Sequence, residues 1–187
     1  MLNTLAGIIA SSGGAAAGGD YESIATVTVG AGGAAEITFT SIPSTYQHLQ
    51  VRGILREATG GYDQLYLQIN TDTANNYAKH ALYGDGSTVT STGNATQNHI
   101  SLAPIPGSNQ TASVFMGAVV DLLDYKNTNK YKTIRSLSGV DTNGSGYAWF
   151  SSGLWQNTNA ITSLKLYTSS AANIAQYSSF ALYGIKG

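Results

Sequence analysis

The sequence predicts an all-β protein: an antiparallel, jelly-roll-like β-sandwich preceded by an extended N-terminal arm. Three observations predict this fold. Short runs of alternating apolar and polar residues recur from Tyr21 onward, with turn residues between them. No segment of useful length repeats its apolar residues with the period of a helix. Only 10% of the residues are charged, far fewer than the quarter that is usual for a soluble domain.

Two alternating runs near the start of this domain are expected to form a β-hairpin. Apolar residues alternate over 25–29 and again over 35–39, and Gly30–Gly33 supplies a turn between them. The polar stretch Ser87–Asn98 is expected to be a loop. The short run that follows starts at Ile100 and contains two prolines, which is typical of an edge strand because proline donates no hydrogen bond to a ladder.

The most apolar run, Val114–Leu123, predicts a buried central strand. A short helix is the alternative, which periodicity alone does not settle for such a run. The remaining strands are expected over residues 49–55, 65–69, 77–83, 134–140, 147–155, 161–167 and 177–185, giving about ten short strands in all.

The first twenty residues differ from the rest, so we expect a flexible arm over 1–20 and a sandwich domain over 21–187. The segment 11–19, SSGGAAAGG, has the composition of a linker. Before it, four apolar residues are spaced to share one helical face: Leu2, Leu5, Ile8 and Ile9. One interpretation is a disordered tail. The other is an anchor that becomes ordered in the groove of a partner. No Lys or Arg precedes the apolar residues, so a signal peptide is not predicted.

Composition excludes several classes of function. The formal net charge is −1, which provides no general attraction for nucleic acid or for an anionic membrane. The absence of cysteine excludes disulfides, thiol catalysis and cysteine-ligated zinc. No apolar run approaches the length of a membrane-spanning helix.

No catalytic motif is found, and we do not expect an enzyme or a cofactor. The three histidines, His48, His80 and His99, lack metal-ligand spacing. A glycosidase needs two opposed carboxyl groups. Asp121 and Asp124 are close in sequence, but they lie where an apolar run gives way to a loop, a position where Asp usually caps or turns the chain.

Two polar motifs have both a functional and a structural interpretation. Asp141–Gly146 matches the opening of a calcium loop, but Ser152 stands where the bidentate Glu would be, so a hairpin turn is favoured and no metal is predicted. A basic cluster could meet an acidic partner, although a solvated hairpin is favoured. It consists of Lys126, Lys130, Lys132 and Arg135.

Two tryptophans are close in sequence and would point to the same side of a strand. Trp149 and Trp155 are expected mainly as core aromatic residues, because large rings usually fill the interior. The alternative is a platform on which sugar rings stack.

The sequence resembles a group of small structural proteins of tailed phages, including phages of cyanobacteria. The resemblance is carried by DLLDYKNTNKYKTIRSLSGVDTNGSGYAWFSSGLWQNTNAITSLKLY (121–167) and QYSSFALYGIKG (176–187). The earlier segments YESIATVTVG (21–30), ITFTSIPSTYQHLQVRGI (37–54) and YAKHALYGDGS (77–87) are similar to the same group.

The resemblance implies a virion surface component, made in the host cytoplasm and bound to the capsid. It implies a homotrimeric jelly roll that acts as a capsid cement or decoration protein, with the major capsid protein or another virion protein as its partner. The alternative is a tail-fibre or baseplate adhesin that binds host glycans. No catalytic or binding residue is carried over from the group.

Overall fold

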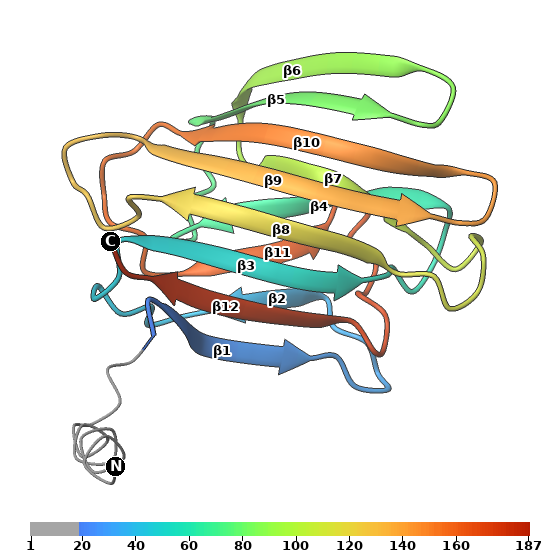
Figure 1. The fold of residues 1–187 in the computed structure, drawn as a ribbon, viewed down its shortest axis with the longest axis horizontal. Helices are drawn as coiled ribbons and strands as arrows, with labels where there is room; N and C mark the ends of the chain where they lie inside the picture. The colour runs from blue at the N-terminus through green and yellow to red at the C-terminus, as the bar shows by residue number, and fades with distance from the viewer. Residues whose placement is uncertain (1–18) are drawn as a thin grey trace, which may run out of the picture.

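The computed structural model describes residues 19–187, and within that range the chain is all β with no helix (Figure 1). Nothing in it could therefore cross a membrane as a helix. The strands are, in chain order, β1 (Tyr21–Thr28), β2 (Glu36–Phe39), β3 (His48–Leu55), β4 (Tyr62–Ile69), β5 (Tyr77–Gly84), β6 (Val89–Gln97), β7 (Ile100–Pro106), β8 (Met116–Leu123), β9 (Lys132–Asp141), β10 (Gly146–Trp155), β11 (Leu164–Thr168) and β12 (Ser179–Ile185).

The strands form two antiparallel sheets packed as a β-sandwich. The larger sheet has eight strands in the order β1-β12-β3-β8-β9-β10-β5-β6, and the smaller has four in the order β2-β11-β4-β7. The quartet β1-β12-β3-β8 facing β2-β11-β4-β7 is the strand order of an eight-stranded jelly roll, in which two Greek keys are wound together. The fold class predicted from the sequence is confirmed.

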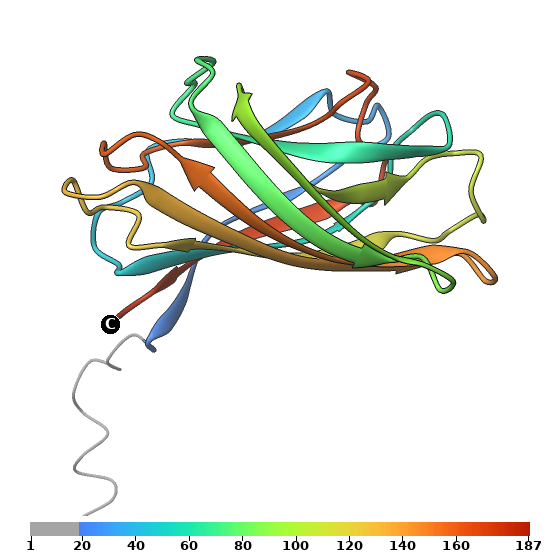
Figure 2. The ribbon, with the colours of Figure 1, turned by 90° about the horizontal axis from the view of Figure 1, so that it is seen from above.

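Two inserted hairpins widen one sheet of this jelly roll. The β9–β10 hairpin follows β8 in the chain and pairs with it through β9. The β5–β6 hairpin follows β4 and pairs with β10 through β5. In Figure 2 the β5–β6 hairpin rises from the larger sheet toward the level of the smaller one. The larger sheet therefore extends beyond the edge of the smaller sheet on this side.

Alternation of side chains explains why these segments form strands with one buried face. In β9 every second residue from Lys132 to Val140 is buried and the residues between them are exposed. The strand β7 is buried along its whole length, although it is an edge strand, as its prolines predict. Residues 116–123 of the apolar run 114–123 form the strand β8 between β3 and β9, which decides against the helix.

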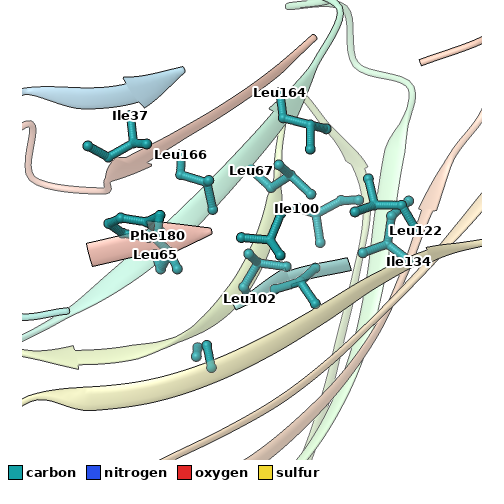
Figure 3. Packing of buried hydrophobic residues seen from close by; sticks show 14 of the residues in the cluster. Ile37, Leu65, Leu67, Ile100, Leu102, Leu122, Ile134, Leu164, Leu166 and Phe180 are labelled. Carbon is teal, nitrogen blue, oxygen red and sulfur yellow. The ribbon is translucent and has the colours of Figure 1, made fainter. Parts of the chain in front are cut away.

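The core lies between the two sheets, where buried side chains from both layers meet (Figure 3). The smaller sheet contributes Ile37, Leu65, Leu67, Ile100, Leu102, Leu164 and Leu166, and the larger sheet contributes Leu122, Ile134 and Phe180. These contacts hold the two sheets together in a fixed register. We call the face of the larger sheet that points away from this core its outer face.

The predicted hairpin over 25–29 and 35–39 is wrong. The first run lies in β1, which pairs with β12, and the second lies in β2, which pairs with β11 in the other sheet. The glycine-rich segment between them does turn, since Gly33 N–H donates to Gly30 O at 3.0 Å. Ala34 then bridges to Ile174 instead of returning to β1. The turn thus carries the chain from one sheet to the other.

The predicted loop over 87–98 is also wrong, because most of it forms β6. This strand pairs with β5 over Val89–Gln97 at the edge of the larger sheet. Its side chains are largely exposed, so the strand needs no apolar stripe, and its threonines have a high β-propensity.

Candidate functional site

The outer face of the larger sheet carries five exposed apolar side chains, which we call the apolar band. Their exposed fractions run from 46% for Phe150 to 76% for Val89. The band consists of Ile54, Leu82, Val89, Leu137 and Phe150, contributed by β3, β5, β6, β9 and β10. Four of the five lie on the two inserted hairpins. The insertions therefore build most of this surface.

Strand register places part of the band in one continuous ridge. Leu82 is opposite Phe150, and Phe150 is opposite Leu137. Leu137 in turn is opposite Val119 of β8. Directly opposite residues on one face of an antiparallel pair have their Cβ atoms about 5 Å apart. The ridge therefore crosses four neighbouring strands without a polar interruption.

A trough of small residues runs beside the ridge. Gly117, Gly139, Ala148 and Gly84 are successive partners across β8, β9, β10 and β5, with Ile54 at one end. Two shallow hollows, of 840 Å³ and 680 Å³, lie along this trough and share Gly139. The missing side chains allow another molecule to come close to the backbone here.

Polar residues border the ridge on its other side. Gln50 Nε2 donates to Asp121 Oδ1 at 2.8 Å, and Arg135 is paired with Asp121 at 3.3 Å. Arg52 is opposite Val119 and lies at the end of the ridge, with its guanidinium 5.4 Å from the ring centre of Tyr21. An apolar centre with a polar, internally paired border is the usual anatomy of a protein-binding surface.

The arm residues predicted to bind a partner lie outside the described residues. Leu2, Leu5, Ile8 and Ile9 belong to the part of the chain before residue 19. The arm therefore stays a prediction. Its attachment point is described, since Lys186 N–H donates to Asp20 O at 2.8 Å beside the edge strand β1.

Both predicted tryptophans lie on the inner face of β10, on the same side of the strand. Trp155 is 1% exposed and donates from Nε1 to Asp72 Oδ2 at 2.8 Å. Trp149 is 7% exposed and stacks on Tyr83 with ring centres 4.1 Å apart. Neither presents a ring face on the outer surface, so the predicted core interpretation fits both positions.

The calcium-like motif forms the turn between β9 and β10. Asn143 N–H donates to Asp141 Oδ1 at 2.7 Å, and Thr142 N–H donates to Ser145 O at 2.7 Å. Gly144 has a φ of 117°, a conformation that favours glycine. The Asp141 carboxylate thus serves the turn. In residues 19–187, no three His, Cys, Asp or Glu side chains gather in a way that would hold a metal ion.

The basic cluster lies on the β8–β9 hairpin with Lys130 and Arg135 exposed, as the solvated interpretation expects, but Lys132 departs from it. Lys132 is 1% exposed, and its ammonium group donates to three backbone carbonyls, those of Asn127, Lys130 and Thr158. Lys130 is paired with Asp124. With Arg135 also paired, the cluster is largely satisfied from within the protein.

Asp121 and Asp124, the two carboxylates that are close in sequence, take part in these same ion pairs. Asp124 receives hydrogen bonds from Lys130 and Gln47, which lower its pKa, and its own backbone N–H donates to His48 Nδ1 at 2.9 Å. Asp121 is held between Gln50 and Arg135. Both carboxylates thus have structural partners.

The apolar band was not predicted, although the sequence carries a signal for it. Leu137 and Phe150 lie at positions of their strands whose immediate neighbours are buried, and alternation places a polar residue at such positions. An apolar residue out of phase on several strands would have indicated a second apolar face.

No family model, no curated protein and no solved structure matches this chain. The interpretation of the site therefore depends on the geometry described above and on the chemistry of its residues.

Proposed function

We propose that this chain is a structural protein of a tailed-phage virion, a capsid cement protein that binds between shell subunits. It acts as a homotrimer on the capsid surface after synthesis in the host cytoplasm, with no cofactor and no catalytic residue. The apolar band contacts the shell. The arm binds a groove of the neighbouring major capsid protein through Leu2, Leu5, Ile8 and Ile9.

The observation that carries this proposal is the exposed apolar band. Soluble monomers rarely leave a large contiguous apolar surface in water, and such surfaces mark sites of association. Here the ridge and its trough cross most of the larger sheet, and paired polar residues border the ridge on the side away from the trough. A wide, shallow surface of this kind fits a protein partner better than a small substrate.

The fold and the energetics of repeated binding also support this proposal. Jelly rolls recur in viral capsid proteins and lectins, although a fold alone does not define a function. A protein that binds only the assembled shell stabilises the assembled state by linkage. Many modest contacts repeated over a lattice, with an arm adding a second attachment point, give a large combined affinity.

The band is tested by decorating heads that lack this protein with purified chain. Wild type should saturate the heads, and Leu137→Asp should reduce occupancy by about tenfold or more, because it places a charge at the centre of an apolar contact. Tyr131→Asp is the matched control. Tyr131 is similarly exposed at 52% but lies in the β8–β9 loop, away from the band. Equal occupancy for Leu137→Asp and wild type would contradict the proposal.

The arm is tested by deleting residues 1–19. The truncated protein should keep the circular dichroism spectrum of a folded sandwich and lose attachment to heads. Full occupancy by the truncated protein would refute the role of the arm. Electron microscopy of labelled virions separates cement from adhesin, since the proposal requires label on the head and the adhesin hypothesis requires label on the tail.

A further inference from the structure

A third hollow lies away from the apolar band, where the β5–β6 hairpin extends past the edge of the smaller sheet. Its volume is 230 Å³, and its walls come from β4, β5, β6, the start of β7 and β10. Drug-sized ligands occupy about 300–1,000 Å³, so this hollow suits a single small ring. It opens on the other side of the larger sheet from the surface proposed to bind the shell.

Lys79 provides the only positive charge of the hollow at neutral pH. Its side chain is half-buried on the inner face of β5, with Nζ 5.6 Å from the ring centre of Trp149. No carboxylate lines the hollow, and among residues 19–187 none forms an ion pair with Lys79. Burial lowers the pKa of Lys79. An anion at this ammonium group would offset the cost of burying it.

Aromatic rings form two walls. His99 stacks on Tyr66 with ring centres 3.7 Å apart, and its Nδ1 lies 2.7 Å from Asn98 Oδ1. Burial and the nearby charge of Lys79 lower the pKa of His99, which favours the neutral form of its ring. Trp149 forms the other wall. Flat apolar walls of this kind pack against the C–H face of a sugar ring.

Amide and hydroxyl groups complete the lining. Ser101 Oγ donates to Gln64 Oε1 at 2.9 Å. The amide nitrogen of Gln64 has no protein acceptor in the described chain. Asn94 contributes a second amide and Gln97 a third. Side-chain amides offer donors and acceptors together, which matches the mixed character of sugar hydroxyl groups.

We propose that this hollow binds an acidic monosaccharide unit, with its carboxylate on Lys79, its ring against the aromatic walls and its hydroxyl groups on the three amides. The proposal does not depend on the role in a virion. It requires a ligand that carries both a carboxylate and a polyhydroxylated ring, because each half of the lining recognises one of them.

The test uses the full chain titrated with D-glucuronate, followed through the two indole N–H signals in nuclear magnetic resonance spectra. The Trp149 signal should shift on binding, whereas the signal of Trp155, which is buried and bonded to Asp72, should not. D-glucose and acetate each carry half of the required chemistry. Each should bind at least about tenfold more weakly than D-glucuronate.

Lys79→Met removes the charge, keeps most of the side-chain volume and should weaken glucuronate binding by about tenfold or more. Lys165→Met is the matched control, since Lys165 also lies over an aromatic ring, 4.9 Å from the centre of Tyr167, on the smaller sheet. Thermal unfolding of both variants checks that they are folded. Equal binding of acetate and glucuronate, or unchanged binding by Lys79→Met, would overturn the proposal.

Discussion

Single polar residues join loops to the core of this sandwich, and Asp72 is the clearest example. It follows β4, and its carboxylate accepts hydrogen bonds from Trp155 Nε1, from Asn76 Nδ2 and from the backbone N–H of Ala74, each at 2.8–2.9 Å. Burial acts to raise the pKa of Asp72, but these hydrogen bonds outweigh it and lower the pKa. The folded state therefore favours the ionised carboxylate.

Asp72→Asn should destabilise the protein by about 1–3 kcal/mol at pH 7, because the new amide places a donor among donors. The folded pKa of Asp72 is lower than the unfolded one, so its stabilising effect is complete above the unfolded value of about 4 and is lost as pH falls below it. Urea unfolding at pH 7 and pH 2.5 measures this. The difference in the free energy of unfolding between the variant and wild type should be smaller at pH 2.5 than at pH 7. An equal difference at both pH values would contradict the stabilising role of the ionised Asp72.

Lys132 shows how far a buried charge can be satisfied by the backbone. Lys132→Met leaves three carbonyls without their donor and should cost about 3 kcal/mol in the free energy of unfolding. Lys130→Met removes a partner from a surface ion pair in which Lys130 is 53% exposed, and should cost less than about 1 kcal/mol. Denaturant unfolding of both variants compares them. Similar losses would mean that the buried ammonium has no special role.

At the scale of the elements, β10 packs tightly against β7 at a glycine. A Cβ on Gly153 would lie 2.8 Å from Ile100 Cγ2, well inside normal contact distance. Gly153→Ala should therefore cost about 1–3 kcal/mol through overpacking. Gly117→Ala on β8 is the control, because nothing lies within 4 Å of the added Cβ, and its effect should stay within about 0.5 kcal/mol.

A double-mutant cycle identifies the contact. If Ile100 is the residue that Gly153→Ala displaces, Ile100→Val should cost less in the Gly153→Ala background than in wild type. Thermal unfolding of the four proteins gives the coupling. Strict additivity would show that the strain lies elsewhere.

Whether a strand could be predicted from the sequence depends on whether one of its faces is buried. Strands with one buried face, such as β9, were predictable because alternation records that face in the sequence. The strand β6 was not, since an exposed edge strand needs no apolar stripe. The false hairpin has a different cause. A glycine-rich segment such as Gly30–Gly33 predicts that the chain turns. It does not predict which strand the next one pairs with, because long-range packing between the sheets decides that.

At the scale of the whole molecule, sequence alone indicated a sandwich and the absence of familiar catalytic motifs, but it could not locate the surfaces. The hollow around Lys79 gathers residues from positions 64 to 149, which become neighbours only through the strand order. The sequence marks Trp149 as a large aromatic residue, yet its surroundings depend on β5 and β6, and the sequence predicts a loop in place of β6. A surface that several strands build together can be located only when the strand order is known.

The balance of charge and exposed apolar surface leads to a last prediction. With a formal net charge of −1, little repulsion separates copies of the chain, while the apolar band stays in water until a partner covers it. The isolated protein should associate beyond the proposed trimer, and ammonium sulfate should strengthen this association because it favours apolar contact. Sedimentation velocity measures the effect. Leu137→Asp should abolish it, whereas Tyr131→Asp, with the same change in charge but away from the band, should not. If both variants suppress association equally, net charge rather than the apolar band controls it.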